Sequence, residues 1–131
     1  MEFGFSPEEE AFRKEVQDWL TENPPEKFPR QINQFVGMIG VSQEYSLQLG
    51  NKGWLMPEWT KEYGGQDRSV MEKLILIEEL AHRKAPTLGH FSADLVGPCI
   101  IHYGTEEQKR EWLPKLARGE FLCEGYSEPE A

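Results

Sequence analysis

The sequence has few cysteines and no metal-ligand pattern, and both absences exclude classes of protein. Its two cysteines, Cys99 and Cys123, form no CxxC pair. We therefore expect reduced thiols and a cytoplasmic location. The three histidines show no metal-ligand spacing, so we expect no metal site.

Long apolar runs and clustered positive charge are also missing. A bilayer span needs about 20 consecutive apolar residues, whereas the longest runs here are short, as at residues 74–77. We expect no transmembrane segment, and residues 1–5 lack the features of a secretory signal. The formal net charge is -9, with 14 basic residues scattered among 23 acidic ones. A nucleic-acid surface needs clustered Lys and Arg, so no nucleic-acid partner is expected.

What is present is a set of helix signals. Ser6, Ser69 and Thr105 each stand three residues before a Glu or Gln, which is the capping-box pattern at a helix start. Apolar residues at helical spacing follow each of them. Weaker patterns predict helices over residues 42–52 and 90–103.

These signals predict an all-α fold, an up-and-down bundle of about five helices. Pro114 is expected to split the fifth helix, and Gly97-Pro98 to kink the fourth. The third helix is apolar around much of its circumference, which favours a place in the middle of the bundle. After Gly119 the pattern changes to a strand start at residues 121–127. We therefore expect a helical domain over 1–119 and the start of a β-domain over 120–131.

Two features invite a functional interpretation from residue type alone. Trp54 and Trp59 stand in a Pro- and Gly-containing loop, and we expect both indoles to cover one end of the core. Glu78 and Glu79 are adjacent carboxylates, a pattern compatible with acid–base chemistry. A solvent-facing carboxylate beside a locally paired one is the more common arrangement, and we favour it here.

Three segments, in this order, carry a resemblance to a known family. They read GWLMPEWTKEYGG at 53–65, YGTEEQK at 103–109 continuing as LPKLARGE at 113–120, and GYSEPEA at 125–131. Together they resemble the acyl-CoA dehydrogenase family, and the resemblance covers the whole chain. Thr60 departs from the family pattern, which often has proline after the second Trp.

The resemblance implies an oxidoreductase of fatty acid β-oxidation. Such a flavoprotein uses FAD to convert an acyl-CoA thioester into trans-2-enoyl-CoA, and an electron-transfer flavoprotein reoxidises the flavin. Family members form homo-oligomers or heteromers. The family's catalytic base is a glutamate of the C-terminal domain, so we assign no catalytic residue here and expect the chain alone to be inactive. The family motif continues with Gly-Ser-Asp beyond the position of Ala131, so we expect the sequence to be a truncated part of a longer protein.

The resemblance also implies site residues. Tyr126 and Ser127 would run beside the flavin, although Ser127 also reads as an ordinary turn residue. A wall of the acyl pocket would form on the kinked fourth helix, from Leu95, Val96, Gly97 and Cys99. The same residues are also compatible with packing against the third helix.

Two functions from other classes stay open. One is a non-catalytic helical module that binds or assembles a partner dehydrogenase subunit. The other is an unrelated helical adaptor.

Overall fold

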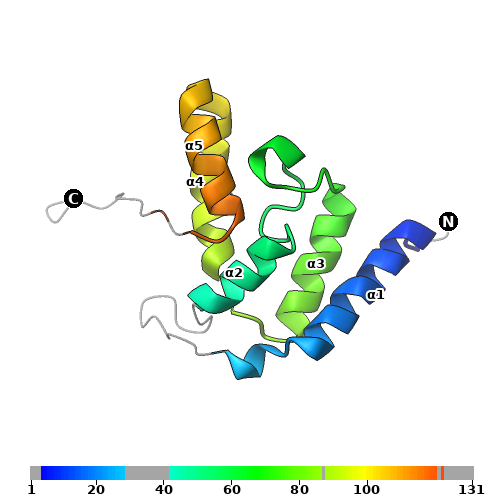
Figure 1. The fold of residues 1–131 in the computed structure, drawn as a ribbon. Helices are drawn as coiled ribbons and strands as arrows, with labels where there is room; N and C mark the ends of the chain where they lie inside the picture. Colours follow the sequence, from blue (N-terminus) through cyan, green and yellow to red (C-terminus); the bar gives the residue numbers. More distant parts are fainter. Residues whose placement is uncertain (1–3, 29–41, 87, 121, 123–131) are drawn as a thin grey trace, which may run out of the picture.

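The computed structural model describes residues 4–28, 42–86, 88–120 and 122, and within these ranges it contains helices and no strand. The long helices are α1 (Pro7–Glu22), α2 (Gln43–Asn51), α3 (Val70–His82), α4 (Leu88–Tyr103) and α5 (Glu106–Ala117), and the short 3-10 helices are η1 (Pro25–Lys27) and η2 (Lys61–Tyr63). The predicted all-α up-and-down bundle of five helices is confirmed (Figure 1). Of the predicted strand start, only Leu122 lies among the described residues.

The helix starts follow from local hydrogen bonding. At α1 the backbone N–H of Glu9 donates to the Ser6 hydroxyl at 3.2 Å, and the Ser6 N–H donates to the Glu9 carboxylate at 2.7 Å. The same reciprocal pair opens α3 and α5. Each box satisfies two backbone donors at a helix N-terminus that would otherwise lack a partner. All three predicted capping boxes are confirmed.

The apolar core is divided into two clusters. The first lies between α1, α2 and α3 and includes Trp54, while the second lies between α4, α5 and η2 and includes Trp59. Figure 1 shows the corresponding pairs, α1 beside α3 and α5 antiparallel to α4. The loop between α2 and α3 therefore supplies one indole to each cluster. Our expectation that both indoles cover one end of a single core was wrong.

Two other details differ from the sequence expectations. α5 runs without a break through Pro114. Proline removes one backbone hydrogen bond, but Leu113 and Leu116 on either side of it are buried in the second cluster and hold the helix together. α3 is not covered on all sides by the described residues, because Leu74 remains 53% exposed on its outer face.

The lengths of the helices bear on membrane association. Across the described ranges, none is both long and apolar enough to cross a bilayer.

Candidate functional site

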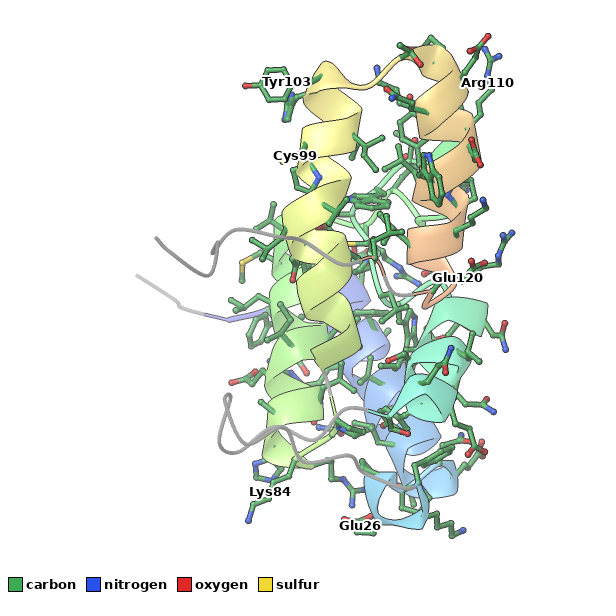
Figure 2. The ribbon with its side chains drawn as sticks, turned by 90° about the vertical axis from the view of Figure 1, so that its left-hand side faces the viewer. Glu26, Lys84, Cys99, Tyr103, Arg110 and Glu120 are labelled. Atoms are coloured by element: carbon green, nitrogen blue, oxygen red, sulfur yellow. The ribbon has the colours of Figure 1, made fainter. Side chains whose placement is uncertain are left out.

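An open cleft lies along α4 and α5. Val96, Cys99, Ile100 and Tyr103 line one side, because their spacing of three and four residues places them on one face of α4. Gln108 and Trp112 of α5 line the cleft as well, together with Gly104 and Leu122. Its volume is about 440 Å³, which lies within the usual range for small-molecule sites. Figure 2 shows Cys99 and Tyr103 on the upper half of α4.

The side of the cleft formed by α5 is fixed by short-range contacts. The Gln108 side chain is held by the capping box, because its Oε1 accepts a hydrogen bond from the Thr105 N–H at 2.8 Å. The Lys115 ammonium lies 4.2 Å from the centre of the Trp112 ring, within cation–π distance. These contacts limit the orientations of the side chains on that side of the cleft.

The lining is mainly apolar, with a few polar groups. The lining residues that carry a polar side-chain group are Cys99, Tyr103, Gln108 and Trp112. Among the described lining residues none is charged. Such a surface can exclude water from an apolar tail and donate hydrogen bonds at its rim. It cannot neutralise a phosphate, and no group of three or more metal-ligating side chains occurs in the part of the chain that the structure describes.

The structure separates the four residues predicted for the acyl wall. Val96 and Cys99 both line the cleft. Leu95 is half-buried and lies outside the lining, whereas Gly97 is buried. The predicted flavin contacts, Tyr126 and Ser127, lie outside the described residues.

Gly97 faces the second core cluster instead of the cleft. A Cβ built on it would lie well inside 3.0 Å of two carbons of the Trp59 indole. The space left by the missing side chain is therefore occupied by Trp59, which is 7% exposed. This contact lets the indole pack against the α4 backbone close to Pro98.

Six cleft residues were not predicted from the sequence: Ile100, Tyr103, Gly104, Gln108, Trp112 and Leu122. A usable signal was present in the α4 stripe, since Val96, Cys99, Ile100 and Tyr103 have helical spacing. Trp112 reads in the sequence as a core residue, but it is only half-buried. Leu122 could not be found this way, because it lies beyond the end of α5.

The adjacent carboxylates Glu78 and Glu79 form a structural ion-pair group. The Arg13 guanidinium lies 2.7 Å from Glu78 and 2.6 Å from Glu79, and Gln17 donates to Glu79 at 3.1 Å. Hydrogen bonds to Glu78 and then Glu79 raise the pKa of Arg13. Both carboxylates are thus engaged between α1 and α3, in the cluster that does not contain the cleft.

A second ion-pair group joins α3 to α4. The Lys73 ammonium lies 2.5 Å from Glu58, in the loop before α3, and 3.2 Å from Asp94 on α4. Burial by itself would lower the pKa of Lys73, but the hydrogen bond to Glu58 and the attraction of both carboxylates outweigh it, so the pKa is raised. Lys73 is the cation that links the loop, α3 and α4.

Comparisons with known proteins agree with this fold. Residues 6–120 match the family model for the acyl-CoA dehydrogenase N-terminal domain. The chain is 37% identical to acyl-CoA dehydrogenase FadE26 of Mycobacterium tuberculosis, over all of this chain and 34% of that protein. It is similar in structure to the ChsE4-ChsE5 complex of Mycobacterium tuberculosis, with a TM-score of 0.75 and 36% identity over all of this chain and 33% of that one.

A second solved structure gives the same result. The Tcur3481-Tcur3483 steroid ACAD matches with a TM-score of 0.74 and 32% identity, over all of this chain and 34% of that one. The chain thus spans about a third of the length of each of these relatives. Because the family model covers nearly the whole chain, this protein belongs to the acyl-CoA dehydrogenase family and corresponds to its N-terminal helical domain.

Proposed function

We propose that this chain is the N-terminal portion of an FAD-dependent acyl-CoA dehydrogenase that converts an acyl-CoA thioester into trans-2-enoyl-CoA. The observation that carries the proposal is the apolar cleft of about 440 Å³ on α4 and α5, in a chain of this family. In this proposal the cleft shields part of the acyl tail from water. The domain boundary proposed with it places the helical domain at 1–119 and the start of the β-domain at 120–131.

The residues of the cleft fit an acyl tail better than they fit FAD. The described lining offers apolar surface from Val96, Ile100 and Leu122 but no Lys or Arg for the FAD pyrophosphate. The described residues do not form an FAD site by themselves, so we derive no reaction step through the cofactor. Tyr126 and Ser127 stay proposed flavin contacts, and most of the flavin site would lie outside this chain.

Within the chain we propose binding roles and no catalytic base. Val96 and Cys99 would contact the acyl tail directly, whereas Leu95 would border the cleft. Gly97 would act indirectly, because it seats Trp59 beneath α4. Glu78 and Glu79 are already engaged by Arg13, which supports the expectation that the chain is inactive alone.

Assembly and electron transfer are part of the same proposal. The ChsE4-ChsE5 structure is described as a complex, and we propose that the full protein also works as a heteromer with a related subunit. We further propose that an electron-transfer flavoprotein is its electron acceptor. Tcur3481-Tcur3483 is described as a steroid ACAD. Acyl-CoA thioesters that carry a ring system are therefore a second class of substrate to test, beside those with linear chains.

Calorimetric titration of the purified chain with CoA, butyryl-CoA and octanoyl-CoA tests the role of the cleft. Each buried methylene contributes about 0.8 kcal/mol, so we expect octanoyl-CoA to bind more tightly than butyryl-CoA and CoA to bind least. Val96→Glu should abolish the difference, while Leu47→Glu, at an exposed position on α2, should preserve it. If the wild-type chain binds all three ligands equally, the cleft is not part of the acyl site.

The alternative function is a helical module that assembles with a partner dehydrogenase subunit. The absence of a free carboxylate from the described cleft lining is compatible with it. Tight binding to a related subunit, without any dependence on acyl chain length in the titration, would favour this second function.

A further inference from the structure

Two neighbouring residues of the loop between α2 and α3 hold α4 in place. Glu58 accepts a hydrogen bond from the Lys73 ammonium at 2.5 Å, and the same ammonium donates to Asp94 of α4 at 3.2 Å. Trp59 places its indole against the Gly97 backbone, in space that a Cβ would fill. Asp94 and Gly97 are three residues apart, so both contacts fall within one turn of α4. We call these two contacts the α4 brace.

The α4 brace meets the helix where one of the helix's own hydrogen bonds is missing. Pro98 lies inside α4 and has no N–H to donate to the carbonyl of Asp94, four residues earlier. Helices bend at such positions. In this turn the Asp94 side chain is paired with Lys73, and the Gly97 backbone is packed on Trp59. Contacts from outside the helix therefore hold the turn whose internal hydrogen bonding is interrupted.

The loop that carries the brace is cross-linked by its own backbone. The Trp59 N–H donates to the Met56 carbonyl at 3.1 Å, and the Trp59 carbonyl accepts from the Asp67 N–H at 3.0 Å. The Pro57 carbonyl accepts from the Arg68 N–H at 2.9 Å. Bonds on both sides of residue 58 thus fix the backbone from which the side chains of the brace extend.

The brace and the cleft lie on different sides of the same part of α4. Val96 and Tyr103 line the cleft, and they stand about half a turn round the helix from Asp94. Gly97 stands about a quarter of a turn from Val96. Because α5 forms the other side of the cleft, a shift of the braced turn changes the distance between the two sides. The brace therefore controls the width of the cleft without lining it.

We propose that Trp59 and Lys73 are positioning residues that set which acyl tails the cleft accepts, an inference that rests on the proposed function of the cleft. Neither residue is among the described lining residues. Trp59 acts through Gly97, and Lys73 acts through Asp94. A ring has a larger cross-section than a linear tail. Loss of either contact lets the turn at Pro98 move, and this shifts the preference of the cleft toward the bulkier tail.

Hydrogen exchange of the whole chain tests the brace without any ligand. Asp94→Asn removes the charge that Lys73 holds, and Trp59→Phe shortens the side chain that packs on Gly97. Each variant should speed exchange of the α4 amides at 99–103, relative to the amides of α1, at least about threefold. The reason is that local opening of the unbraced turn becomes easier.

The binding of two matched thioesters tests the effect of the brace on selectivity. Octanoyl-CoA and cyclohexylacetyl-CoA have the same number of acyl carbons, arranged as a chain or partly as a ring. Calorimetry should show that both brace variants shift the ratio of the two Kd values at least about threefold in favour of cyclohexylacetyl-CoA. Asp18→Asn, in an exposed pair on α1, and Trp19→Phe, beside the first core cluster, are the matched controls. Both controls should keep the wild-type ratio and the wild-type exchange at 99–103.

Different outcomes contradict the brace and the acyl site. If the wild-type chain discriminates between acyl tails but the brace variants keep its ratio, the cleft binds the tail and the proposal for Trp59 and Lys73 alone is overturned. That proposal is also overturned if exchange in α4 rises only in step with exchange in α1, because the contacts then stabilise the whole fold and no particular turn. If the wild-type chain binds both thioesters no more tightly than CoA, the proposed function fails and the selectivity role fails with it.

Discussion

The indole of Trp59 lies directly against the backbone of Gly97, in space that any other residue at position 97 would occupy with its Cβ. This contact joins the loop between α2 and α3 to the middle of α4. The part of α4 that lines the cleft is therefore held in place by a contact on an adjacent face of the same helix. Position 97 consequently affects the cleft without lining it.

Gly97→Ala is expected to destabilise the protein. Replacing Gly by Ala within a helix normally stabilises it by up to about 1 kcal/mol, but here overpacking against Trp59 should cost about 1–3 kcal/mol. Urea unfolding of both proteins measures the difference. Gly4→Ala is the matched control, because a Cβ at residue 4 would meet nothing within 4 Å. A Gly97→Ala variant at least as stable as wild type would refute the close packing.

Lys73→Met is expected to lower the free energy of unfolding by about 1–3 kcal/mol, since two carboxylates lose their shared cation. The Oε2 atom of Glu58 is already buried with no hydrogen-bond partner among the described residues, so the loss would leave Glu58 still less satisfied. Lys14→Met is the control, because Lys14 and Asp18 are 73% and 63% exposed and form an ordinary surface pair. That control should change stability by less than about 0.5 kcal/mol. Equal losses in the two variants would contradict this expectation.

The lowered pKa of Glu72 predicts that the protein loses stability in acid. Burial raises its pKa, but hydrogen bonds from Arg68 and from the Ser69 backbone outweigh burial, so the pKa in the folded protein is below its ordinary value of 4.5. The ionised Glu72 carboxylate therefore stabilises the folded protein fully above pH 4.5, and this stabilisation is lost as the pH falls through the pKa of Glu72 in the folded protein. Urea unfolding at a series of pH values between about 6 and 3 should show a shallower decline for Glu72→Gln than for wild type. Parallel curves would show that Glu72 contributes nothing to acid sensitivity.

Cys99 offers a direct probe of the cleft. Its exposed thiol lines the cleft, so a thiol reagent should label it readily in a Cys123→Ser background. We expect octanoyl-CoA to slow this labelling, because the acyl tail would cover the sulfur, and CoA alone to slow it less. Mass spectrometry of the labelled peptide gives the rate. Labelling that octanoyl-CoA leaves unchanged would place the tail elsewhere.

The helices could be predicted from the sequence because their signals are local. A capping box such as Ser6 with Glu9 lies within four residues, and it fixes the helix start wherever the helix packs. The effect of Pro114 was mispredicted because tertiary burial of Leu113 and Leu116 outweighs one missing hydrogen bond. The exposed side of α3 could not be predicted either, because an apolar residue such as Leu74 looks the same in the sequence whether it is buried or exposed.

The candidate site was only partly predictable for a related reason. Val96 and Cys99 share a helix face, so helical spacing brings them together. Gly97 follows Val96 directly, and its position lies about a quarter of a turn further round the helix, facing Trp59. The face of α4 that meets the cleft is decided by packing against Trp59 and α5. Trp59 lies 38 residues before Gly97 in the sequence, and α5 begins nine residues after Gly97, at Glu106. Contacts of that range leave no local signal.

Grafting residues 1–131 in place of the matching N-terminal third of FadE26 tests the proposed function most directly. The measurement is trans-2-enoyl-CoA formation, with FAD and an artificial electron acceptor, from the CoA thioesters that unmodified FadE26 oxidises. We predict that the chimaera forms the enoyl product, and that Val96→Glu in the graft reduces it. A chimaera that folds and retains FAD but forms no enoyl product from any of these thioesters would contradict the proposal that this chain is the helical portion of an acyl-CoA dehydrogenase.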